Sequence, residues 1–560
     1  MRLKKVLIVV GSLLLLFFVA ITVLKSWVEN KFEGTINSNP ERKYDLTFDD
    51  LSLSFFQGNI ELLSLKITPL NSDSASTIIN GSVQKASLEG ISFLSYLFSK
   101  EISIKNLSFI NPKFTLIHQD FPKKHSENSK PFQSIFKDII SRGEIMNFSL
   151  IGGEGSIYYQ DTSNTLGSFR ELRILASGLE TDSVLVSRAI PFQLENIEIG
   201  IKDLIYKLSE DQVLSLGSYD FNFEKGEMDL HQLSLKLNLD WKELAKKHSQ
   251  QEEIMEFDIG HLGLRGISTD SRFYDSLMVI SRSIEIDSLD FYISKDKNRP
   301  EKAKEIKKDF SYLLEALEFP IEVDSFRIKN SKITYSEIGK GKTDPGKITL
   351  TEISGLIMNL SSIEEVQKEK SLMVQVSAIF DDSGKLNLDV QENYFERKWN
   401  ADLTLENMDM RRLNQTVNHL AGISIESGNI QKLHLNMEAN ANSSDNHFLM
   451  QYKDLKMELL NAEDHKKGFL STIANLAIHK QHQPGDKHYQ ELSYSTTRDH
   501  YKGPINLIWL SAKDGLLATI PTGLAHKLMP HSKESKTEKK EERVEKREER
   551  KTSKKEKSNN

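Results

Sequence analysis

Alternation of apolar and polar residues runs through most of this chain, and it constrains the fold more than any other feature. Residues 44–48, 60–67 and 102–109 place an apolar side chain at almost every second position, with Ser, Thr, Asp, Asn, Glu or Lys between. A period of two residues predicts half-buried strands. Turn-forming residues at 57–59 and 110–112 are expected to separate these strands. The sequence therefore predicts a mainly β chain of antiparallel strands.

The alternating pattern also repeats along the chain. The matched segments, in the same order in both copies, are 44–48 with 219–223, 58–62 with 226–230, 63–67 with 233–237, 86–92 with 262–268, and 102–109 with 284–291. The offset is roughly 170–180 residues, which indicates a tandem duplication. A shorter unit, residues 191–206, matches residues 320–335 without a gap.

The N-terminus predicts a membrane anchor. Residues 6–24 form an uncharged stretch of about 19 residues, enough for a helix to cross a bilayer. We expect this stretch to anchor the chain in the bilayer through apolar side chains that include Val6, Leu13, Leu16, Phe18 and Leu24. Basic residues precede it, so the N-terminus is expected in the cytoplasm and the bulk of the chain on the far side. The alternative is a cleavable signal peptide, which the long apolar core and the lack of a small-residue cleavage site disfavour.

The remaining chain divides by pattern into several regions. We expect a cytoplasmic stub at 1–5, the anchor at 6–24, β-repeat regions at 28–216 and 217–400, a third β region with short helices at 401–530, and a charged, disordered tail at 531–560. Helical signals are sparse, at 92–99, 131–140, 300–317 and 408–420. The apolar segment 503–530 contains charges and a proline, which favours an amphipathic or core element over membrane-surface contact.

Composition and motifs argue against several function classes. The chain has no cysteine, which removes thiol catalysis and cysteine metal sites, and its net charge of −7 disfavours nucleic acid as a partner. The run Gly339-Lys340-Gly341-Lys342-Thr343 lacks the first glycine of a phosphate-binding loop and is interpreted as a hairpin loop. Residues 152–155, Gly-Gly-Glu-Gly, are interpreted as a turn or bulge. We predict neither a catalytic residue nor a cofactor, and the chain is not expected to be an enzyme.

One histidine cluster is a candidate metal site. His479, His482 and His488 lie near Asp486 and His465, but Gln, Pro and Gly residues between them indicate a flexible turn. The turn is the favoured interpretation, so we predict no metal site.

A long series of two-faced strands with few helices to cover it predicts a twisted sheet that curls into a groove with an apolar lining. An apolar surface left open in water calls for a ligand, and acyl chains are the candidate. The side chains expected to line the groove, chosen from alternation alone, are Leu235, Ile286, Phe326 and Ile328.

Several segments carry a resemblance to a known family. The N-terminal anchor, residues 51–62 and 86–92, and the unit ending Ile333-Thr334-Tyr335-Ser336-Glu337 resemble AsmA-like proteins, as do residues 408–414, 422–428 and 450–456. The resemblance implies an inner-membrane-anchored periplasmic protein of Gram-negative bacteria, related to the repeating β-groove lipid-transfer superfamily. Its implied partners are the inner membrane, phospholipid and other envelope proteins, and its implied role is outer-membrane homeostasis. The alternative is a non-catalytic envelope scaffold whose sheet is covered by its own helices or by a partner.

Overall fold

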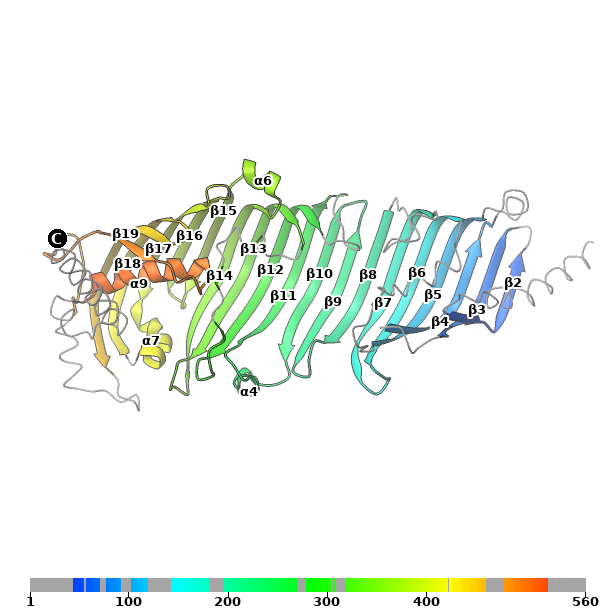
Figure 1. Ribbon diagram of the computed structural model, residues 1–560, viewed down its shortest axis with the longest axis horizontal. Coiled ribbons are helices and arrows are strands. Elements are labelled where there is room, and N and C mark those ends of the chain that lie inside the picture. Colours follow the sequence, from blue (N-terminus) through cyan, green and yellow to red (C-terminus); the bar gives the residue numbers. More distant parts are fainter. Residues whose placement is uncertain are drawn as a thin grey trace, which may run out of the picture.

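The computed structural model describes residues 44–54, 57–70, 77–91, 102–118, 143–181, 196–268, 278–303, 306–307, 314, 319–421, 423–459 and 478–521. These residues form a single elongated, twisted sheet with a few short helices at its rims and one end (Figure 1). The prediction of a mainly β chain with few helices is confirmed. The predicted anchor at 6–24, with Val6, Leu13, Leu16, Phe18 and Leu24, and the charged tail at 531–560 lie outside the described residues.

The described ranges contribute twenty strands to the sheet. In chain order they are β1 (Tyr44–Thr47), β2 (Asp50–Ser54), β3 (Asn59–Pro69), β4 (Thr77–Glu89), β5 (Ile102–His118), β6 (Gly143–Tyr159), β7 (Thr165–Thr181), β8 (Asn196–Lys207), β9 (Gln212–Asn222), β10 (Glu227–Leu237), β11 (Glu253–Ile267), β12 (Val279–Asp296), β13 (Ile321–Ile338), β14 (Pro345–Ser361), β15 (Leu372–Phe380), β16 (Gly384–Asn393), β17 (Lys398–Asp409), β18 (Ile423–Ala439), β19 (Ser443–Leu459) and β20 (Leu492–Thr497).

From β3 onward each strand pairs with the next in the chain, while β1 and β2 pair with different halves of β3. Two neighbouring pairs, β5 with β6 and β12 with β13, are parallel. The prediction of a purely antiparallel sheet is therefore wrong at these two places. A parallel pair needs a long crossover connection. Residues 119–142 and 297–320 make these crossovers, and they contain two of the segments with helical signals.

The structure repeats as the sequence does. In each copy an antiparallel set leads into a parallel pair, β3–β6 in the first and β10–β13 in the second. Gly58 and Gly226 begin the two sets with positive φ, and a Cβ on either would lie within 3 Å of the carbonyl oxygen of Ile91 or Ile267 respectively. Side chains are thus excluded at the same point of both copies. The expected region boundaries, between residues 216 and 217 and between 400 and 401, fall within β9 and β17.

Many strands contain one residue with positive φ near their middle. These residues are Ser64 in β3, Asn111 in β5, Gly152 in β6, Glu171 in β7, Asp203 in β8, Gln232 in β10, Ser288 in β12, Asn330 in β13 and Glu352 in β14. The predicted turn at 110–112 is instead such an irregularity inside the 17-residue strand β5. The predicted turn or bulge at 152–155 is an irregularity inside β6, where the pairing with β7 shifts register. In the pairs β6–β7, β7–β8, β13–β14 and β14–β15 the register shifts at these positions. Such irregularities bend a strand and increase its twist.

Five helical segments accompany the sheet in the described part of the chain: α4 (Trp241–Lys247), α6 (Glu364–Glu369), the 3₁₀ helix η2 (Met410–Leu413), α7 (Asn414–Ala421) and α9 (Pro504–Thr519). The helix predicted at 408–420 is η2 followed by α7, because β17 continues to Asp409, whose side chain accepts a hydrogen bond from the Arg411 amide. The predicted helices at 92–99 and 131–140, and most of the one at 300–317, lie outside the described residues. None of the helices in the described ranges has the length and apolar character needed to span a bilayer.

Candidate functional site: a continuous apolar sheet face

One face of the sheet carries an unbroken row of apolar side chains. Following the strand register from β3 to β18, the paired residues are Leu62, Ala86, Phe109, Leu150, Ile174, Ile199, Phe221, Met228, Leu264, Ile284, Phe326, Ile357, Val374, Val390, Ala401 and Met437. We call this row the apolar ladder. With neighbouring strands about 4.8 Å apart, its sixteen residues extend over roughly 70 Å.

The sequence-predicted groove residues lie on this face. Phe326 belongs to the apolar ladder. Ile286 and Ile328 pair with each other. They belong to a second apolar row, which lies two residues along the strands from the apolar ladder and continues through Val376, Leu388, Leu403 and Leu435. Leu235 lies on β10, paired with Leu214 and Phe257. All four predicted residues are half-buried, so part of each side chain is open to solvent.

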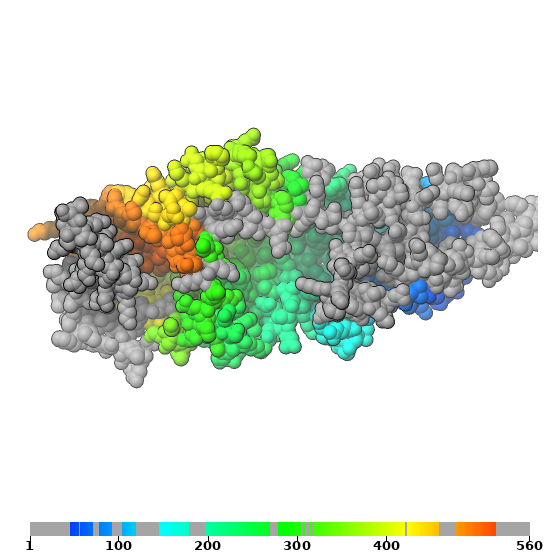
Figure 2. Space-filling view, in the orientation of Figure 1, coloured from blue at the N-terminus to red at the C-terminus, as the bar shows by residue number. Residues whose placement is uncertain are grey.

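The mid-strand irregularities keep the apolar side chains on one face along the full length of long strands. In β10 the apolar positions are Met228 and Leu230, then Leu233 and Leu235, so the alternation changes phase at Gln232, where φ is +55°. Asn111 and Gly152 both lie where the pairing of β5 with β6 is interrupted. The two neighbouring strands therefore bend at the same point along their length. Figure 2 shows the face hollowed between its two long rims in the middle of the molecule.

At the C-terminal end the apolar face is covered. Helix α9 lies across the strands there (Figure 1), with Leu507, Ile508 and Ala512 in the buried core of this end. Gly515 faces the ring of Phe448 so closely that a Cβ would lie 2.5 Å from the ring. Tyr494 donates a hydrogen bond of 2.6 Å to the Ser511 carbonyl. The described part of the segment predicted at 503–530, residues 503–521, thus supplies a core element that covers this end of the apolar face.

Elsewhere no described helix packs on the apolar face, although several ladder residues there are buried: Leu62, Ala86, Leu150, Phe221, Leu264 and Ile284. Helix α4 packs through Trp241 on Ile254, Tyr292 and Ile338, near the strand ends. The pairing places Ile254 opposite Ser294 and the apolar-face residue Met255 opposite Ile293, so α4 lies on the other face. Helix α7 contacts the rim, where the Thr416 hydroxyl donates to the Lys347 carbonyl at 2.5 Å. From β3 to β14 no described helix packs across the apolar ladder.

The opposite face is polar and carries several cross-strand ion pairs. Examples are Lys85 with Glu61 at 2.7 Å, Lys202 with Glu171 at 2.6 Å and Lys329 with Glu285 at 2.8 Å. Such exposed pairs contribute only about 0–1 kcal/mol each to stability. Their charged groups make this face hydrophilic. Two shallow depressions among the described residues are lined mainly by polar-face side chains, and neither of them is the apolar trough.

Asp229 is a carboxylate on the polar face with two cross-strand hydrogen-bond donors. It accepts hydrogen bonds from Arg265 at 2.6 Å and from the His261 ring at 2.7 Å. Partial burial raises the pKa of Asp229, but the hydrogen bonds and charges of Arg265 and His261 outweigh it and hold the pKa below the usual range. The carboxylate is therefore ionised at neutral pH.

The other sequence motifs have plain structural roles. Residues 339–343 lie in the loop between β13 and β14, so the hairpin-loop prediction is confirmed. His482 is buried, with its Nδ1 2.6 Å from the Met450 carbonyl, and His479 stacks on His488 with ring centroids 3.8 Å apart. That cluster is not the only one: Asp229, His231 and His261 also converge, and sequence reasoning missed them because 30 residues separate the two strands.

Comparison with known proteins finds neither a family model nor a curated protein that matches this chain. The class defined by the structure itself is that of an elongated, curved β-sheet protein with one apolar and one polar face.

Proposed function

We propose that this protein holds phospholipid acyl chains against the apolar face of its sheet, as a membrane-anchored component of a Gram-negative cell envelope. The observation that carries the proposal is the apolar ladder, which continues through sixteen strands and is uncovered by described helices from β3 to β14. Burying an acyl chain there is favourable by about 0.8 kcal/mol per methylene, or about 8 kcal/mol for ten methylenes.

The placement in the envelope rests on the sequence. The uncharged stretch at 6–24 and its basic flank favour an N-terminus in the cytoplasm and a periplasmic sheet. The resemblance to AsmA-like proteins supports the same location, with the inner membrane as the source or destination of the lipid. In this account the protein takes part in lipid transport between the envelope membranes, and the covered end at α9 sets the limit of the lipid-holding trough.

The proposal is tested by lipid extraction and mass spectrometry on residues 29–530, purified without detergent from a host that has an envelope. We expect phospholipid in a fixed molar ratio to protein. The variants Ile286→Lys and Ile328→Lys should lose it, because each places a charge on the apolar face. The matched control is Ser377→Lys, an exposed polar-face position next to Val376, and it should retain lipid.

A folded, monodisperse and lipid-free protein would count against lipid binding. It would favour the alternative function, a non-catalytic envelope scaffold whose apolar face is covered by a protein partner. The search would then turn to proteins that crosslink to the same face.

A further inference from the structure

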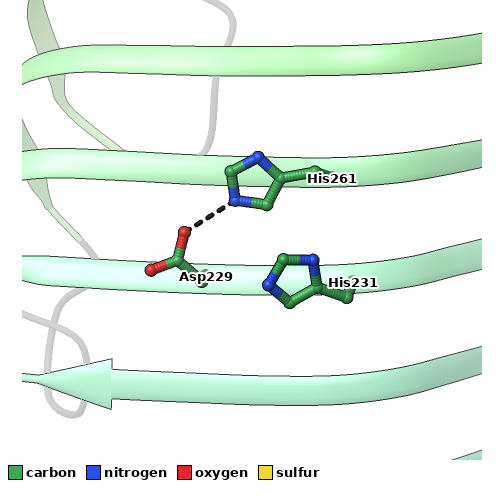
Figure 3. A group of neighbouring side chains, drawn as sticks. All are labelled: Asp229, His231 and His261. Atoms are coloured by element: carbon green, nitrogen blue, oxygen red, sulfur yellow. Dashed lines mark hydrogen bonds and ion pairs between the residues drawn. The ribbon is translucent and has the colours of Figure 1, made fainter.

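Three side chains with metal-binding chemistry meet on the polar face of the sheet. Asp229 and His231 are two residues apart on β10 and so project from the same face, and His261 lies directly opposite His231 on β11 (Figure 3). One potential ligand atom from each residue lies within 4.8 Å of the others. The two imidazole rings stack with centroids 4.6 Å apart, and the His261 Nε2 is 2.7 Å from the Asp229 Oδ1.

The repeated architecture provides two internal comparisons. The same cross-strand pairing of an acid with a base recurs as Glu61 with Lys85 on β3 and β4, and as Asp402 with His434 on β17 and β18. In all three places the base lies opposite the residue two positions after the acid. The residue two positions after the acid, directly opposite the base, is Leu63 in the first case and Thr404 in the third. Only the middle case, with His231, offers a third ligand.

The residue opposite the acid also differs among the three cases. It is Ser87 in the first, Asn436 in the third and Gly263 in the middle. The Asn436 amide donates to the Asp402 carboxylate at 3.2 Å, which occupies an oxygen of that acid. A Cβ at Gly263 would lie 3.0–3.3 Å from the His261 ring and the Arg265 guanidinium. The glycine therefore leaves clearance beside the middle cluster.

The contacts of Asp229 leave room for a cation. The hydrogen bonds from Arg265 and His261 both end on Oδ1, so Oδ2 projects from an oriented and ionised carboxylate. His231 is exposed, so its ring can rotate toward the other two ligands. Nitrogen and oxygen ligands around a tetrahedral zinc ion lie roughly 3.3 Å apart, which requires the His261–Asp229 contact to open by about 0.6 Å.

We propose that Asp229, His231 and His261 form a binding site for a divalent transition-metal ion of the zinc type. Two imidazoles and one carboxylate, with water in the fourth position, are a donor set that suits zinc and neighbouring borderline metals over magnesium or calcium. The ion would clip β10 to β11 on the polar face, and Arg265 would orient the carboxylate from behind. The site is independent of the proposed lipid function.

The test is titration of the purified full-length chain with Zn²⁺ by calorimetry, and with Co²⁺ by visible absorption. We expect one-to-one binding and a Co²⁺ spectrum of low coordination number. His231→Ala should weaken the affinity by more than the roughly 10- to 100-fold that loss of an outer partner causes. This variant is suitable because His231 is exposed and its removal leaves the Asp229–His261 hydrogen bond in place.

His434→Ala is the matched control, because it removes a histidine paired with an aspartate from the case that lacks a third ligand. Its Zn²⁺ affinity should equal that of the wild type. Zn²⁺ should also raise the melting temperature of the wild type and not that of His231→Ala. The proposal is overturned if the chain does not bind Zn²⁺, if His231→Ala binds as the wild type does, or if binding is lost instead in His488→Ala.

Discussion

Two truncations in the same apolar row should differ sharply in their effect on stability. Leu435 is 0% exposed and lies in the core beneath α9, so Leu435→Ala should lower the free energy of unfolding by about 2–5 kcal/mol. Ile286 lies in the same register row but is half-buried. Full burial of an isoleucine is worth about 1.5–3 kcal/mol, so Ile286→Ala should cost only about 1 kcal/mol.

Amide hydrogen exchange, followed by mass spectrometry on delipidated protein, measures both effects locally. A repeat-like sheet can open in segments, so the exchange of β18 reports on Leu435→Ala and that of β12 reports on Ile286→Ala. We expect strong deprotection in the first variant and weak deprotection in the second. Equal losses of about 3 kcal/mol or more would refute the reasoning, because they would mean that Ile286 is as fully covered as Leu435.

Three further predictions concern the backbone, the end of the trough and pH. Gly226→Ala should destabilise the protein by about 1–3 kcal/mol in thermal denaturation, because φ is +63° and the new Cβ would lie 2.9 Å from the Ile267 carbonyl oxygen; an unchanged melting temperature would contradict this. Gly515→Ala should cost about 1–3 kcal/mol by pressing α9 off Phe448, seen as a lower denaturation midpoint in tryptophan fluorescence, and a wild-type midpoint would count against the packing described. Burial raises the pKa of Asp381 above 3.8, so in the native state this group holds its proton to higher pH than in the unfolded state, and stability should fall as pH rises from about 4 toward neutrality. Asp381→Asn should remove that part of the fall in urea midpoints, whereas an identical pH profile in both proteins would refute it.

The sequence predicted the strands well because alternation reports directly on a two-faced sheet. It failed where a mid-strand residue with positive φ interrupts the alternation. Asn111, with φ of +49°, is a turn-forming residue in sequence but bends a continuous strand in the fold, since the pairing of β5 with β4 and β6 holds it there. The parallel pairs were missed because strand direction depends on the crossover segments and leaves no period of its own. Helices α4 and α6 were too short to show a helical period.

The candidate sites show a similar division. Alternation was enough to select Ile286, Phe326 and Ile328, which lie together on one face, although their role in lipid contact stays a prediction. The Asp229 cluster was missed because its residues meet only through the pairing of β10 with β11, and the sequence alone does not give that pairing. A signal did exist: aligning the two sequence copies places Glu61 on Asp229 and Lys85 on His261.

The most direct test of the central claim is photo-crosslinking in living cells with the full-length chain. A benzophenone amino acid replaces Phe326, in the apolar ladder, or Arg327, the exposed neighbour that projects from the polar face. We predict phospholipid adducts after irradiation from the Phe326 position and none from the Arg327 position. Adducts from both positions alike, or protein adducts alone from Phe326, would contradict a lipid-holding apolar face.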